Sequence, residues 1–167
     1  MMNVQIMVTV SGSNQTDLTK VLSDKTHALA GKWLNSKISH IDEYVAGLIK
    51  IEIDADNVEK LLTEFKSLNI HVESVDLGMV THEKSTPLDL CIDGKDRPGL
   101  VRHITQVLSD NSIKVENMEC NRLGVPAIGG TLFTSHFKIV VDEQFNKTAL
   151  VSSLQEIADD LIIDLSA

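Results

Sequence analysis

The amino-acid sequence predicts an α+β protein in which one βαββαβ unit occurs twice in tandem. Short segments of alternating apolar and polar residues predict strands, and apolar residues at a spacing of three to four predict amphipathic helices between them. The same order of segments recurs in both halves, and 167 residues are enough for two small domains. We therefore expect a first domain over residues 1–77 and a second over residues 87–167, joined by a polar linker at 78–86.

The first half begins with a strand from Val4 to Val10, in which every second residue is apolar. Apolar residues then recur at helical spacing from Leu18 to Leu29. We expect Gly31, just past that helix, to adopt the left-handed conformation that often ends a helix. The remaining segments predict strands over 33–41 and 45–53, a helix over 58–68 and a strand over 70–75.

The second half predicts the same order, with strands over 88–92, 113–122, 133–141 and 161–165 and helices over 100–111 and 150–157. A shift of 82 residues places Gly12 on Gly94, whereas a shift of 88 places Lys50 on Lys138. The difference means six extra residues in the second half, which fit a loop at Gly124–Gly130. An insertion confined to a loop, with the pattern kept on both sides, indicates a duplicated unit.

A βαββαβ unit folds as a ferredoxin-like sandwich, with two helices over one face of an antiparallel sheet and strand order 4-1-3-2. The opposite face of each sheet carries apolar residues among the polar ones. Those that we expect there are Met7, Trp33, Met118, Cys120 and Leu132. Such a face needs cover from the other unit or from a second subunit, so a homo-oligomer, most simply a dimer, is expected.

Charge and hydropathy disfavour several classes of function. The formal net charge is −9 and the pI is about 5.0, which opposes direct binding to nucleic acid. No stretch of apolar residues is long enough to predict a membrane span, and the N-terminus is typical of a strand rather than a signal peptide. Two cysteines do not make a disulfide framework, so we expect a cytoplasmic protein.

The turn before the second unit's first helix has the chemistry of a ligand site. We expect Pro98, with its preset φ, at the first helical position and Asp96 as an acceptor for free helical N–H groups. Gly99 lets a ligand approach the backbone. The partial positive charge of the helix end favours a carboxylate, and Asp96 or a backbone carbonyl could meet an ammonium group. The alternative is a purely structural turn.

The segment Asp93–Val101 resembles the signature of ACT domains, in which a strand, the residues D-R-P-G-L, a helix and a strand follow one another. The segment Ala30–Leu34 and the later Tyr44–Leu48 resemble the first ACT module of the glycine cleavage system transcriptional repressor family. Pro126–Phe133 is similar to the longer loop of that family's second module. The first unit lacks the D-R-P-G turn and has Asn14–Leu18 instead.

The resemblance implies a non-enzymatic regulatory protein that senses a small amino acid, glycine in that family, and modulates a transcription activator by protein–protein contact. It implies ligand-binding roles for the turn and for two residues of the following strand. These residues are Asp96, Arg97, Pro98, Gly99, Leu100, Asn117 and Met118. The alternative is an assembly module that acts by oligomerisation and binds no ligand.

Other reactive side chains carry no recognisable catalytic pattern. The six histidines and two cysteines include no H-E-x-x-H or C-x-x-C spacing, so we expect neither a metal nor another cofactor. We expect His103 to be partly buried or at an interface rather than a general base. Trp33, the single tryptophan, is expected to anchor an interface.

Overall fold

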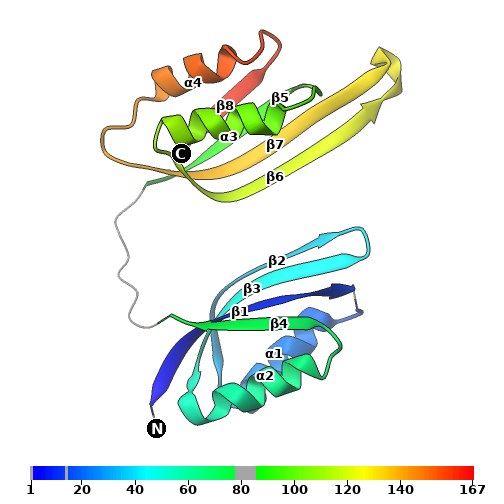
Figure 1. Cartoon of the computed structure of the whole chain (residues 1–167), viewed down its shortest axis with the longest axis vertical. Coiled ribbons are helices and arrows are strands. Elements are labelled where there is room, and N and C mark those ends of the chain that lie inside the picture. The colour runs from blue at the N-terminus through cyan, green and yellow to red at the C-terminus, as the bar shows by residue number, and fades with distance from the viewer. Residues whose placement is uncertain (1, 14, 78–85) are drawn as a thin grey trace. The chain divides into compact units, whose positions relative to one another are not determined.

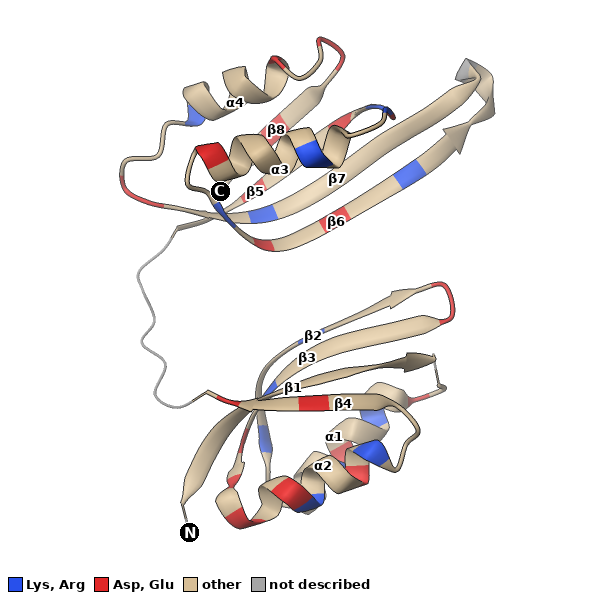
Figure 2. Cartoon of the chain, in the orientation of Figure 1, with Lys and Arg blue, Asp and Glu red and all other residues tan. Residues whose placement is uncertain are grey.

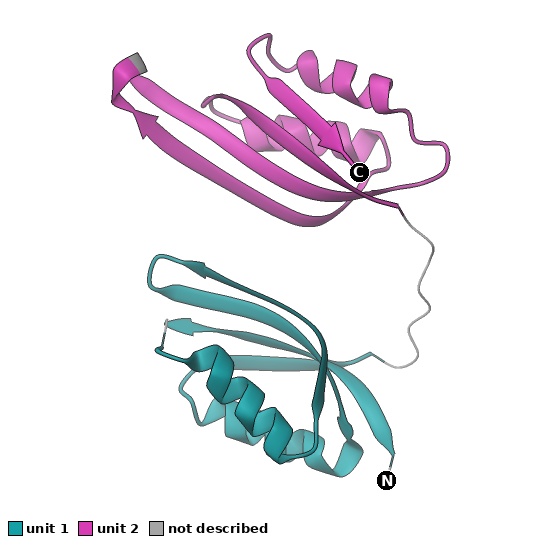
Figure 3. Ribbon diagram, turned by 180° about the vertical axis from the view of Figure 1, so that it is seen from behind, with its two compact units in different colours: residues 1–82 teal, residues 83–167 magenta. Residues whose placement is uncertain are grey.

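The computed structural model describes residues 2–13, 15–77 and 86–167, and it divides the chain into two compact units (Figures 1 and 3). Unit 1 covers residues 1–82 and unit 2 covers residues 83–167. Residues 78–85 of the predicted linker lie outside the described residues, and Thr86 is the first residue of a strand.

Unit 1 has the predicted order of elements. They are β1 (Asn3–Ser13), α1 (Leu18–Ala28), β2 (Lys32–Ile41), β3 (Tyr44–Asp54), α2 (Val58–Lys66) and β4 (His71–Asp76), with a short 3-10 turn over Ala55–Asn57. The antiparallel sheet has the order β2-β3-β1-β4, and α1 and α2 cover one of its faces (Figure 1).

Unit 2 repeats this architecture. Its elements are β5 (Thr86–Lys95), α3 (Leu100–Asp110), β6 (Lys114–Val125), β7 (Gly130–Val141), α4 (Lys147–Gln155) and β8 (Ile162–Ser166), with a 3-10 turn over Pro126–Ile128. The sheet order β6-β7-β5-β8 matches that of unit 1, with α3 and α4 over one face. The predicted α+β fold of two ferredoxin-like sandwiches is therefore confirmed. None of the helices in the described residues is long and apolar enough to cross a bilayer.

Each unit has its own apolar core between its sheet and its helices. In unit 1 the helix-facing residues of β1 and β3 are almost completely buried, as Val8 and Ile49 show with no exposed surface. In unit 2, Leu90 of β5 and Phe137 of β7 are buried to the same degree. The period of two in the strands thus places one apolar side of each sheet against the helices.

A β-bulge changes the orientation of residues in one edge strand of each unit. In β2 the register shifts between Trp33 and Asn35, and in β6 it shifts 82 residues later, between Val115 and Asn117. Since a bulge adds one residue, it moves every later side chain to the other face.

This corrects three of the five residues predicted on the outer faces. Trp33 and Cys120 pack against the helix-side cores of their units. Met118 lies opposite the buried Phe137, and directly paired residues share a face. Alternation along strands without bulges would place Trp33, Met118 and Cys120 on the outer face of the sheet, away from the helices.

The ends of α1 and α3 have the same hydrogen-bonded termination. The N–H of Gly31 donates to the carbonyl of Thr26 (2.9 Å), and the N–H of Ala30 donates to that of His27 (2.9 Å). It is Ala30, at φ 57°, and not Gly31 that takes the left-handed conformation. Gly31 serves packing instead, because a Cβ there would lie 2.8 Å from Cγ2 of Thr26. Ser112, at φ 56°, ends α3 in the same way.

The six extra residues of unit 2 lengthen a hairpin. The loop predicted at Gly124–Gly130 contains only a short turn, because Gly124 and Val125 pair with Thr131 and Gly130 as part of β6 and β7. A glycine-rich segment can continue a strand pair when register and hydrogen bonding allow it.

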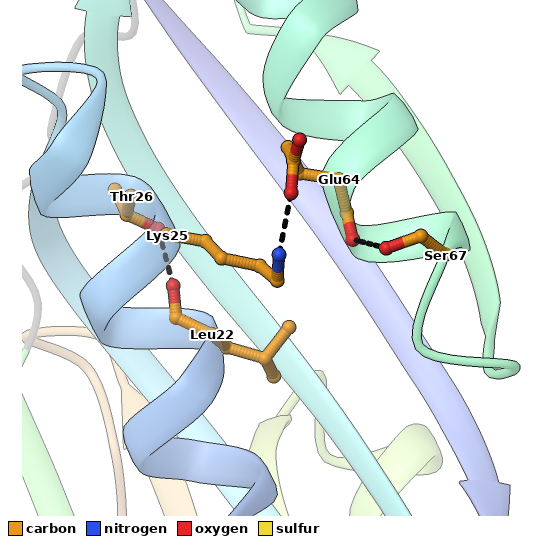
Figure 4. A network of polar contacts seen from close by, with 5 residues as sticks. All are labelled: Leu22, Lys25, Thr26, Glu64 and Ser67. Carbon is orange, nitrogen blue, oxygen red and sulfur yellow. Dashed lines mark hydrogen bonds and ion pairs between the residues drawn. The ribbon is translucent and has the colours of Figure 1, made fainter.

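Polar contacts join the helices of unit 1 to each other and to the sheet. Lys25 of α1 forms an ion pair with Glu64 of α2, whose carbonyl also accepts the hydroxyl of Ser67 at 2.7 Å (Figure 4). The buried hydroxyl of Thr26 donates to the carbonyl of Leu22 at 2.8 Å (Figure 4). It also accepts the indole N–H of Trp33 at 3.0 Å. The single tryptophan is therefore fixed to α1.

Candidate functional site

The D-R-P-G turn connects the end of β5 with the start of α3. The N–H of Asp96 donates to the carbonyl of Thr131 (2.9 Å), which continues the pairing of β5 with β7 past the end of the strand. Gly99 precedes α3 at φ 78°, a conformation that strongly favours glycine. Pro98 lies two residues before the helix, so it is not the first helical residue. The left-handed turn at Gly99 separates the two.

Asp96 pairs with β6 instead of capping α3. Nε of Arg122 lies 3.0 Å from both carboxylate oxygens of Asp96, and its guanidinium carbon lies 5.7 Å from the centre of the Phe133 ring. The prediction that Asp96 accepts hydrogen bonds from the free N–H groups of α3 is therefore wrong. The register of the β6–β7 hairpin, which sets Arg122 opposite Phe133, brings the arginine to the turn.

Arg97 ties the same turn to the loop before β8. It forms an ion pair with Asp160, whose other carboxylate oxygen accepts the N–H of Lys95 at 3.0 Å. These hydrogen bonds, that of Arg97 first, lower the pKa of Asp160 below its ordinary value. Gly94 lets the two segments approach, since a Cβ there would lie 2.7 Å from Cδ2 of Leu161.

The start of α3 presents backbone rather than side chains. Among the described residues, no side chain caps this helix. The N–H of Leu100 donates to the carbonyl of Arg97 (3.4 Å), and that of His103 to the carbonyl of Gly99 (2.9 Å). The side chain of Leu100 is fully buried, so it anchors the helix in the core. His103 is exposed, and its Cε1 lies 3.6 Å from where a Cβ on Gly99 would be.

The turn residues Asp96–Leu100 lie together, but Asn117 and Met118 do not join them within the unit. Arg122, the β6 residue at the turn, is five positions further along the strand than Asn117, about 17 Å at the usual rise per residue. Asn117 and Met118 also point to opposite faces of the sheet. The sequence reasoning missed Arg122 and Asp160. Counting the hairpin register could have found Arg122, whereas no local signal marks Asp160.

Unit 1 reproduces the backbone of this turn without its sequence. Asp17 adopts φ 63° before α1, where Gly99 stands before α3. The N–H of Leu18 donates to the carbonyl of Gln15 (3.3 Å), and that of Val21 to the carbonyl of Asp17 (2.9 Å). The left-handed helix entry is therefore a feature of both units.

The pKa of each of the two thiols lies above its ordinary value. Partial burial raises the pKa of Cys120, and burial together with the carboxylates of Asp164, Asp93 and Asp89 raises the pKa of Cys91. Both cysteines are free. Within residues 2–13, 15–77 and 86–167, no group of three or more histidine, cysteine or acidic side chains could hold a metal ion.

Two solved structures match this architecture over the whole chain. An unknown protein from Galdieria sulphuraria is 18% identical, with a TM-score of 0.87, over 99% of this chain and 98% of that one. A protein provisionally described as a glycine cleavage system transcriptional repressor is 13% identical, with a TM-score of 0.72, over the same shares of the two chains. The chain therefore shares the fold of these two structures, with two ferredoxin-like βαββαβ sandwiches in tandem.

The ACT domain of a GTP pyrophosphokinase from Chlorobium tepidum is 22% identical over 49% of this chain and 99% of that domain, with a TM-score of 0.39. No protein-family model matches the sequence, and no curated protein matches it significantly.

Proposed function

We propose that this chain is a non-enzymatic regulatory protein that binds a small amino acid at the D-R-P-G turn of unit 2. Glycine is the ligand that the family resemblance suggests. Binding would modulate a transcription activator through protein–protein contact. The start of α3 carries this proposal, because it presents an uncapped helix end beside a left-handed glycine, with charges of both signs next to it.

The turn offers complementary groups to a zwitterion. The helix end and the guanidinium groups of Arg97 and Arg122 favour a carboxylate, and the carboxylates of Asp96 and Asp160 favour an ammonium group. Gly99 leaves room for a ligand close to the backbone. The full-length likeness to the repressor-like structure supports the regulatory role, and the raised pKa of both thiols fits a protein without covalent catalysis. In the cytoplasm, both free cysteines would stay reduced.

The second candidate is an assembly module that binds no ligand. It is favoured by the same ion pairs, because Asp96 and Arg97 already have partners in Arg122 and Asp160 and so hold the turn in place by themselves. A ligand would have to compete with these pairs, which are partly exposed and therefore weak. In this case the exposed apolar side chains would serve contacts between subunits, as Leu48 and Leu123 illustrate.

A thermal-shift screen of the amino acids separates the two candidates. A ligand at 100 times its Kd stabilises the native state by about 2.7 kcal/mol, which raises the melting temperature of a domain of this size by several degrees. We expect glycine to give such a shift. If no amino acid does so and the chain still forms dimers in size-exclusion chromatography with light scattering, the assembly module is the correct function.

A pair of variants places the site. Gly99→Asn should fold, because Asp17 of unit 1 adopts the same left-handed backbone conformation before α1. The side chain of the new asparagine would lie in front of the start of α3 and block a ligand there. Gly129→Asn is the matched control, since Gly129 is also left-handed (φ 63°) and a Cβ there meets nothing within 4 Å. We expect Gly99→Asn to lose the glycine shift and Gly129→Asn to keep it. A shift that survives in Gly99→Asn would place the site elsewhere.

A further inference from the structure

The sheet of unit 1 has an outer face, turned away from α1 and α2, that carries exposed apolar side chains. Residues of β3 from Val45 to Ile53 alternate between buried and more exposed, so every second side chain points away from the helices. Cross-strand pairing places residues of β1, β2 and β4 on the same outer face. Its large apolar side chains are those of Met7, Ile41, Tyr44, Leu48 and Val75. All of these except Met7 are between 48% and 76% exposed.

The row of residues through Leu48 has opposite charges at its two ends. Leu48 lies opposite Lys37 of β2 on one side and Thr9 of β1 on the other, and Thr9 lies opposite Glu73 of β4. The strand order places Lys37 and Glu73 on opposite edges of the sheet. Glu73 also lies 3.1 Å from His71 of its own strand, and both of these side chains are largely exposed. Such a row is self-complementary, because a two-fold axis parallel to the strands sets the lysine of each copy opposite the glutamate of the other.

The corresponding row of unit 2 has like charges at its two ends. Glu119 follows Lys37 by 82 residues, and it lies opposite His136 just as Lys37 lies opposite Leu48. At the other edge of this sheet, Asp164 of β8 ends the row. The same two-fold arrangement would therefore set carboxylates against carboxylates, with a histidine in place of the central leucine. Since like charges that face each other across an interface repel, only the outer face of unit 1 is complementary to a second copy of itself.

We propose that the outer face of unit 1 binds the same face of a second copy of this chain. Leu48 lies beside the two-fold axis, and Lys37 of each copy pairs with Glu73 of the other. The four strands have 10, 11, 11 and 6 residues, so at about 3.4 Å per residue and 4.8 Å between strands the face covers about 600 Å². Two copies bury about 1,200 Å², which is the lower end of the range for specific interfaces. Sheets packed face to face keep their strands within about 30° of each other, as this axis allows.

Charge reversal with rescue tests the pairing. Sedimentation velocity of the full chain over a range of concentrations gives the Kd of the dimer. Lys37→Glu or Glu73→Lys alone sets like charges opposite each other at both ends of the row, so we expect either variant to raise this Kd at least about tenfold. The double variant restores opposite charges, and its Kd should return to within about threefold of the wild-type value. A wild-type chain that stays monomeric, or a double variant that dimerises no more tightly than the single ones, overturns the inference.

Two leucines with similar exposure provide the matched test of the apolar centre. Leu48 of β3 is 48% exposed and Leu123 of β6 in unit 2 is 51% exposed, so a glutamate at either position should leave the fold intact, as far-UV circular dichroism would verify. We expect Leu48→Glu to raise the Kd of the dimer at least about tenfold and Leu123→Glu to change it less than about twofold. The reverse pattern would place the contact on unit 2 and overturn the inference. These measurements use no ligand, so their outcome is independent of the glycine shift expected for unit 2.

Discussion

Ala30→Gly should stabilise unit 1, although glycine is normally the weaker choice. Ala30 adopts φ 57°, a left-handed conformation that costs a residue with a Cβ about 1–2 kcal/mol of conformational energy and costs glycine almost nothing. Glycine also loses more backbone entropy on folding, by about 0.5–1 kcal/mol. The net gain is about 0.5–1 kcal/mol, which corresponds to roughly 2–8 °C in melting temperature for a domain of this size.

The assay is urea unfolding followed by the fluorescence of Trp33, which lies in unit 1 close to the substitution. Ala28→Gly is the matched control, because Ala28 is an exposed residue in the last turn of the same helix. There the same change should destabilise by up to about 1 kcal/mol. A higher free energy of unfolding in Ala30→Gly and a lower one in Ala28→Gly would support the left-handed conformation at the end of α1. A lower free energy of unfolding in both variants would refute the reasoning, since it would mean that Ala30 has an ordinary helical conformation.

Three further perturbations test other parts of the structure. Thr26→Val removes the buried hydroxyl between the Leu22 carbonyl and the Trp33 indole, so it should cost about 1–3 kcal/mol in urea unfolding and change the Trp33 emission. Asp160→Asn should make the folded state less sensitive to acid. Folding lowers the pKa of the Asp160 carboxyl, so the ionised carboxylate stabilises the folded state at pH values above the pKa of the unfolded chain. This stabilisation is lost as the pH falls through the lowered pKa of the folded state. The wild type should therefore lose more stability than the variant below about pH 4, and equal acid profiles would contradict the role of the ion pair with Arg97. Ile104→Ala, at a completely buried position, should cost about 2–5 kcal/mol by calorimetry, and a cost near zero would argue against the core of unit 2.

Patterns of local periodicity predicted most of the fold. Alternation along β1, β3, β5 and β7 identified the central strands, because these strands have one face buried and one face open. The duplication followed from comparing the two halves, with the six extra residues at Gly124–Gly130. Local patterns failed at the edges of the sheets. The bulges in β2 and β6 change which residues of these strands share a face, so Trp33 and Cys120 lie on the helix side. Local patterns did not predict the bulges, because a one-residue insertion in a strand leaves no mark on composition.

The candidate site, like the fold, was predictable only where it depends on residues close together in the sequence. The D-R-P-G turn was recognisable because proline and glycine restrict the backbone locally, and its position before an amphipathic helix needed no tertiary information. Its charge partners were not recognisable. Asp160 lies 63 residues from Arg97, and no sequence pattern near either residue predicts their ion pair. Figure 2 shows acidic and basic residues interspersed along the elements of both units, so charge alone does not mark these partners.

The sequence by itself determined the tandem architecture, the order of its elements and the glycine turn, because these depend on residues close together in the chain. Only the tertiary structure decided which side chains meet at the turn and which residues of the edge strands face the core. These depend on strand register and on packing between distant segments, where one residue of offset exchanges the two faces of a sheet.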